Sequence, residues 1–178
     1  MFKKFFPNKI LLLTNAKINS LIVLLILVVI VGLVYSLKIS PPDYVQGDSV
    51  RIMYVHVPSS FIALGCFGFI GTASIFSLIF KIKFMPLLAK SLAPVGLIFA
   101  LISIATGSLW GKPTWGIWWV WDARLTSMSI LLFFYLIYIL SWKFIDNFEK
   151  AKKISSVIAI IGLFNLPVIK YSVDWWNT

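Results

Sequence analysis

The chain has 178 residues, of which 60% are hydrophobic and only 12% are charged. Soluble domains carry about 25% charged residues, so this composition and the mean hydropathy of +0.96 exclude a soluble globular protein. The net charge of +10 does not indicate nucleic-acid binding, because the lysines lie in short connectors between apolar runs, where membrane topology places them. We therefore expect one integral membrane domain over residues 1–178.

Five apolar runs approach the ~20 residues with which a helix crosses a bilayer. They predict an all-α, polytopic bundle with spans over about 20–37, 58–80, 91–109, 125–142 and 154–169. Pro58 and Pro94 are expected in the first turns of the second and third spans, since a first turn leaves its N–H groups unpaired and proline has none to lose.

The connectors on alternate sides of these spans differ in positive charge. The N-terminal segment and the connectors 81–90 and 143–153 hold 11 lysines, whereas 38–56, 110–124 and 169–178 hold five lysines and arginines together. The positive-inside rule then places the N-terminus in the cytoplasm and the second group of connectors outside. The only histidine, His56, lies on that outer side.

The outer connector 110–122 is rich in tryptophan. Five of its thirteen residues are Trp, out of eight in the chain, and its two glycines and one proline predict an interrupted rather than a straight helix. If it were helical, Trp115, Trp118, Trp119 and Asp122 would share one face. Indole faces suit a broad, flat, apolar ligand. The alternative is an interfacial aromatic belt, in which tryptophans are scattered over helix ends rather than crowded into one connector.

Other polar residues on the outer side each have two interpretations. His56 is a candidate axial ligand for haem iron, or an interfacial histidine bonded to a backbone carbonyl. Asp122 either caps the following helix or belongs to a site. Three cations can contact ligand carboxylates or lipid headgroups: Arg51, Lys112 and Arg124. The single histidine and single cysteine match no structural zinc pattern.

Residues 115–127, WGIWWVWDARLTS, resemble the tryptophan-rich "WWD" signature of haem-handling proteins in cytochrome c maturation. The continuation after the aspartate resembles the haem exporter protein C (CcmC) branch. Residues 52–58, IMYVHVP, are similar to that branch's entry to its second span, and residues 173–178, VDWWNT, to its loop after the fifth. The resemblance covers essentially the whole chain.

This resemblance implies a six-helix protein of the bacterial or mitochondrial inner membrane that binds haem b at its periplasmic face. It implies delivery of that haem to the membrane-anchored chaperone CcmE, with the CcmA/CcmB ABC transporter and the small membrane protein CcmD as partners, and no enzymatic turnover. Matched residue by residue, His56 is an axial ligand of the iron. The residues expected to bind the rest of the haem are Trp115, Trp118, Trp119, Trp121, Asp122 and Arg124.

The chain departs from the family at its end. The family's second ligating histidine follows the Trp-Trp-Asn-Thr segment, whereas this sequence stops at Thr178, before that residue and before a sixth span. We therefore expect a C-terminally truncated family member with weakened haem affinity. Two other functions are open: a subunit of a covalent cytochrome c haem lyase, which chain length and the single histidine disfavour, and a haem-free membrane scaffold.

Overall fold

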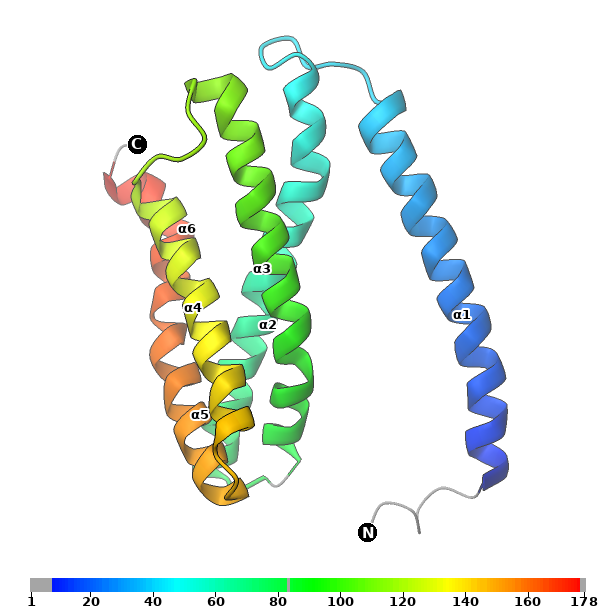
Figure 1. The fold of residues 1–178 in the computed structure, drawn as a ribbon, viewed down its shortest axis with the longest axis vertical. Helices are drawn as coiled ribbons and strands as arrows, with labels where there is room; N and C mark the ends of the chain where they lie inside the picture. The colour runs from blue at the N-terminus through cyan, green and yellow to red at the C-terminus, as the bar shows by residue number, and fades with distance from the viewer. Residues whose placement is uncertain (1–7, 83, 177–178) are drawn as a thin grey trace. The chain divides into compact units, whose positions relative to one another are not determined.

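The computed structural model describes residues 8–82 and 84–176, and these ranges form a helical protein (Figure 1). Within them, five segments are long and apolar enough to cross a membrane, which confirms the prediction of a polytopic helical bundle. The α-helices are α1 (Asn8–Val34), α2 (Met53–Ile79), α3 (Met85–Trp115), α4 (Ala123–Phe144), α5 (Phe148–Leu163) and α6 (Asn165–Trp176).

The chain divides into two compact units, residues 1–42 and 43–178. In the first, α1 continues into a π-helical stretch, Tyr35–Ile39, and the Ser40 hydroxyl donates to the Ser36 carbonyl, 2.7 Å away, where this stretch ends. Over residues 21–34 of α1, exposed apolar side chains lie on all sides of the helix, as is typical of a helix surrounded by lipid. The second unit holds α2 to α6 and every candidate site residue.

In the second unit, α2 packs most extensively against α3 (Figure 1). The buried residues of α3 recur at spacings of three and four, so they form one stripe along the helix. Small side chains let membrane helices approach closely, which compensates for the weak hydrophobic drive inside a bilayer. The stripe consists of Pro86, Ala89, Ala93, Gly96, Ala100, Ser103, Gly107 and Gly111.

A single tyrosine joins three helices at the core. Tyr135 of α4 is fully buried, and its hydroxyl donates to the carbonyl of Ala63 on α2, 2.7 Å away. Its ring meets Phe67 edge to face, with 4.9 Å between the centroids. On α3, Gly96 leaves the space for this ring. The relative placement of α2, α3 and α4, and with it the α3–α4 loop, therefore depends on Tyr135.

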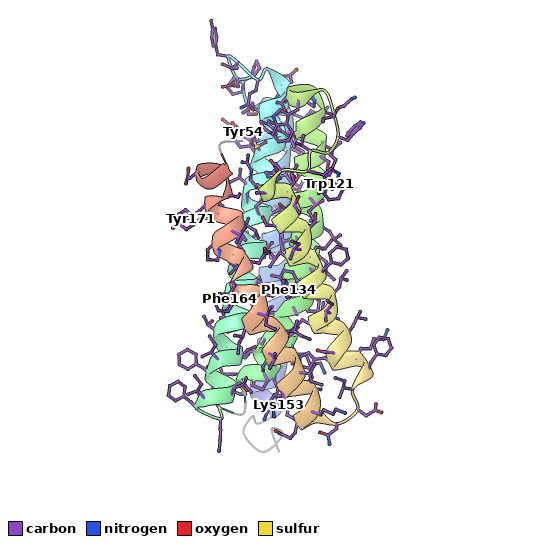
Figure 2. All side chains as sticks on the ribbon, turned by 90° about the vertical axis from the view of Figure 1, so that its left-hand side faces the viewer. Tyr54, Trp121, Phe134, Lys153, Phe164 and Tyr171 are labelled. Carbon is purple, nitrogen blue, oxygen red and sulfur yellow. The ribbon has the colours of Figure 1, made fainter. Side chains whose placement is uncertain are left out.

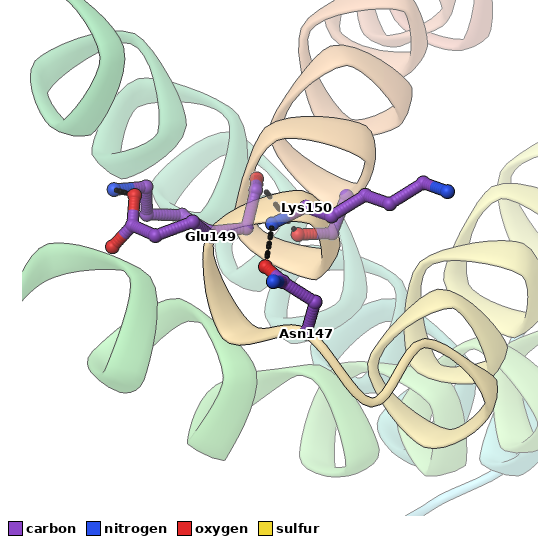
Figure 3. Close-up of polar contacts among 5 residues, drawn as sticks. Asn147, Glu149 and Lys150 are labelled. Atoms are coloured by element: carbon purple, nitrogen blue, oxygen red, sulfur yellow. Dashed lines mark hydrogen bonds and ion pairs between the residues drawn. The ribbon is translucent and has the colours of Figure 1, made fainter.

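The fifth span is two helices rather than the single predicted one over 154–169. Asn147 caps the start of α5, where its Oδ1 accepts the backbone N–H of Lys150 at 2.9 Å (Figure 3). The chain then turns at Phe164 before α6. Pro167 explains this break, because it has no N–H for the carbonyl of Leu163 and its ring crowds that carbonyl.

The second, third and fourth helices begin before the predicted spans do. The second helix begins at Met53, after a 3-10 turn over Asp48–Ile52, so Pro58 lies inside it; the third begins at Met85 and includes Pro94. The fourth covers Ala123–Phe144 rather than 125–142. Polar residues continue a helix beyond its apolar stretch, and neighbouring helices let membrane helices tolerate internal proline.

Candidate functional site

The candidate residues gather at one end of the second unit, where α2 begins and where the loop 116–122 joins α3 to α4. Figure 2 shows Tyr54, two residues before His56, and Trp121 of the loop near this same end, far from Lys153. The guanidinium of Arg124, in the first turn of α4, is close enough to act electrostatically on His56. The structure thus places the imidazole and the tryptophan-rich loop on the same side of the bundle.

His56 lies in the first turn of α2, with its half-buried ring against α3. Its Nδ1 is 2.9 Å from the backbone carbonyl oxygen of Ser103 and 3.1 Å from Oγ1 of Thr106. A carbonyl can only accept, so Nδ1 carries the proton and Nε2 of the neutral ring keeps a lone pair. Among the side chains that the structure describes, none bonds Nε2.

Both interpretations of His56 are compatible with this geometry. The predicted bond to a backbone carbonyl is present, and histidines that bind metals usually donate their second ring N–H to such a group.

The tryptophan-rich connection is shorter than predicted. The α3 helix continues through Pro113 to Trp115 and ends at Gly116, whose φ of 78° suits a glycine and whose N–H donates to the Lys112 carbonyl at 3.0 Å. The Lys112 ammonium in turn donates to the Gly116 carbonyl at 2.9 Å. Only the stretch 116–122 is a loop, so the helix is interrupted as predicted, and Trp118 and Trp119 do not share the face that a continuous helix would give them.

The indoles of this region differ in exposure: those of Trp115, Trp118 and Trp121 are exposed, whereas those of Trp110 and Trp119 are half-buried. Trp118 is 56% exposed and Trp121 81%. Trp119 meets Trp121 edge to face at 5.6 Å, and Trp115 meets Trp110 in the same way at 5.2 Å. The Trp119 Nε1 is buried and finds no acceptor in the described part of the chain. Such an unmade bond costs about 1–3 kcal/mol, so a ligand or a loop rearrangement that supplies an acceptor is favoured.

A turn that the sequence interpretation missed supports Trp110. The indole N–H of Trp110 donates to Oε1 of Gln46, 3.0 Å away. The Asp43 carboxylate shapes this turn, because it accepts the N–H groups of Val45 and Gln46 at 2.9 and 2.8 Å. The bonds to Gln46 and Val45 hold the pKa of Asp43 below its usual value. The sequence signals for such a turn are the prolines before Asp43 and the glycine four residues after it.

The two charged residues after the tryptophans differ in their roles. Asp122 is the N-cap of α4, and its carboxylate accepts the Leu125 N–H at 2.6 Å, so the capping interpretation is confirmed. Arg124 is exposed and forms no ion pair with any residue in the described ranges, whereas Arg51 pairs with Asp48 at 3.2 Å. Arg124 can therefore meet a ligand carboxylate.

The family model described as CcmC, "Heme exporter protein C", matches residues 1–178. The chain belongs to the CcmC family. Several of its curated relatives are named "Heme exporter protein C". That of Escherichia coli K12 is 42% identical over 153 residues, 86% of this chain and 62% of the relative. That of Bradyrhizobium diazoefficiens is 39% identical over 172 residues, 97% and 65% of the two chains.

A third relative is a "Putative cytochrome c biosynthesis ccmC-like mitochondrial protein" of Marchantia polymorpha, 41% identical over 143 residues, which are 80% of this chain and 60% of the relative. The CcmC-family chain thus spans less than two thirds of the length of these proteins. In it, the structure collects His56 and the residues of the loop at one end. The side chains of Trp175 and Trp176, and residues 177–178, lie outside the described part.

Proposed function

We propose that this CcmC-family chain binds haem b at the periplasmic face of the bacterial inner membrane and delivers it for c-type cytochrome biogenesis. The observation that carries the proposal is the position of His56: its Nε2 has no described hydrogen-bond partner at the end of the bundle that presents the exposed indoles. The relatives' names, which describe a haem exporter, support the same assignment. Export and delivery, rather than catalysis, is the role they favour.

The chemistry of haem matches this set of residues. The described residues contain no group of three or more His, Cys, Asp and Glu side chains that could hold a bare metal ion. A lone imidazole suits an iron that brings four porphyrin nitrogens of its own. In this proposal His56 ligates the iron, and the faces of Trp115, Trp118, Trp119 and Trp121 contact the flat ring. Arg124 meets the carboxylates at the ring's edge.

The charge at the opposite end of the unit supports the proposed orientation. Four lysines and Glu149 line a cavity of about 850 Å³ where α2 ends and α5 begins; the lysines are Lys81, Lys150, Lys152 and Lys153. Positive charge of this kind favours the cytoplasmic side, which supports a periplasmic position for the tryptophan-rich loop at the other end. There the loop would pass haem to the chaperone CcmE, while CcmA, CcmB and CcmD would be the membrane partners.

Haem titration into the purified chain in lipid nanodiscs tests the proposal. We expect a haem absorption band. The haem affinity should fall about 10-fold or more in His56→Ala, since the proposed iron ligand is lost, and free imidazole should partly restore it. The double variant Trp118→Ala/Trp119→Ala should also weaken binding. Trp142→Phe, at the opposite end of α4, is the matched control and should bind as the wild type does.

Two outcomes would replace this function with another. A wild-type chain that stays colourless with excess haem would contradict haem binding and favour a scaffold. Haem that is bound but reaches the thiols of an apocytochrome directly, with no transfer to the chaperone, would favour the lyase subunit.

A further inference from the structure

His56 is tied to α3 through its backbone as well as through its ring. The Ser60 hydroxyl donates to the His56 carbonyl at 2.8 Å and lies 2.6 Å from the hydroxyl of Ser103. Because the Ser60 hydroxyl already donates its proton to the His56 carbonyl, the Ser103 hydroxyl donates the second bond to Oγ of Ser60. One turn of α3 therefore contacts both the ring and, through Ser60, the main chain of His56.

The bonds of Thr106 decide which way its hydroxyl faces the ring. Its Oγ1 donates to the carbonyl of Ile102 at 2.6 Å, so it presents lone pairs toward Nδ1 of His56. The Ser103 carbonyl also presents lone pairs there. A bare Nδ1 would face two acceptors with no proton between them, so both neighbours favour the ring form with the proton on Nδ1.

Gly107 leaves the space that the ring occupies. A Cβ at this position would lie 3.1 Å from Cε1 of His56, which is tighter than an ordinary contact, and 3.5 Å from Nδ1. Thr106 and Gly107 come three and four residues after Ser103, so both lie beside Ser103 on one face of α3. The ring thus lies against a glycine and is bonded by the two residues beside it on that face.

We propose that Thr106 and Gly107 are positioning residues that hold His56 with its proton on Nδ1 and with Nε2 available to the iron. This inference rests on the proposed function, since it concerns the same ligand. A second hydrogen bond of this kind orients a ligating imidazole and raises its basicity, and its loss typically weakens metal binding 10- to 100-fold. The ligand is then set in place before haem arrives, which reduces the ordering cost of binding.

The single histidine makes the ring form directly measurable in the haem-free protein. With nitrogen-15 histidine, the two ring signals come from His56 alone. At about pH 8.5, above the ordinary histidine pKa of ~6.5, the ring is neutral. We expect a protonated Nδ1 and an unprotonated Nε2 in the wild type. Thr106→Val should raise the fraction of the other form several-fold, and Thr106→Ser should restore the wild-type signals.

Thr72→Val is the matched control, because the Thr72 hydroxyl bonds only carbonyls of its own helix, at 2.9 and 3.0 Å. It should leave the His56 signals unchanged. Gly107→Ala gives a second variant: the added methyl group should move the ring and shift both signals. In haem-loaded protein, Thr106→Val should weaken haem binding about 10-fold and raise the reduction potential, since a less basic ligand stabilises ferric iron less.

The results separate this inference from the function on which it rests. A wild-type protein that binds haem but carries the proton on Nε2, or a Thr106→Val variant with unchanged ring signals, overturns the positioning role alone. A protein with the proton on Nδ1 that takes up no haem overturns the proposed function, while the hydrogen-bond assignment stands.

Discussion

Gly96 is the position at which one added methyl group tests the packing of this bundle most directly. A Cβ there would lie 2.1 Å from Oη and 2.4 Å from Cζ of Tyr135, whereas ordinary contacts begin near 3.4 Å. Tyr135 has little freedom to yield, because it is fully buried and bonded to Ala63. Overpacking costs about 1–3 kcal/mol, and the lost hydrogen bond about 0.6–1.5 kcal/mol. Alanine also gains about 1 kcal/mol of helix propensity over glycine, so Gly96→Ala should destabilise the fold by about 1–3 kcal/mol.

The free energy of unfolding in mixed micelles, measured by titration with a denaturing detergent, checks this value. Gly65→Ala is the matched control, because nothing lies within 4 Å of a Cβ at Gly65 and both changes bring the same gain in helix propensity, about 1 kcal/mol. Tyr135→Leu in the Gly96→Ala background should recover part of the loss. Equal stabilities of the two alanine variants would refute the packing described for α3 and α4.

Two further predictions concern the polar contacts near the loop. Asp122→Ala should lower the unfolding free energy by about 1 kcal/mol, because the cap of α4 is lost. Asp122→Asn keeps an acceptor for the Leu125 N–H and should stay near the wild type. A fall in haem affinity in the asparagine variant would show a role beyond capping. Because the pKa of Asp43 is lowered in the fold, its ionised carboxylate stabilises the turn at pH values above the ordinary pKa of 3.8. This stabilisation is lost as the pH falls through the lowered pKa of the folded state. Hydrogen exchange at Val45 and Gln46 should therefore accelerate at low pH relative to Asp43→Asn, and identical profiles in the two proteins would contradict the carboxylate's role.

The number of spans and the cluster of tryptophans between the third and fourth spans could be predicted from the sequence because both depend on local composition. A run of ~20 apolar residues forms a helix in lipid whatever its neighbours are. The motif after Trp115 was equally local, and it led to the CcmC family, which the family model confirms. The capping role of Asp122 was readable for the same reason, since a cap bonds a residue three positions away.

The ends of the helices and the surroundings of His56 were decided only by the tertiary structure. Pro58, Pro94 and Pro113 suggest breaks in the sequence, yet each of them lies inside a continuous helix, as membrane helices tolerate. The proton position on His56 depends on acceptors 47 and 50 residues further along the chain. No local pattern encodes such contacts, because they exist only once the small residues of α3 have let α2 approach closely.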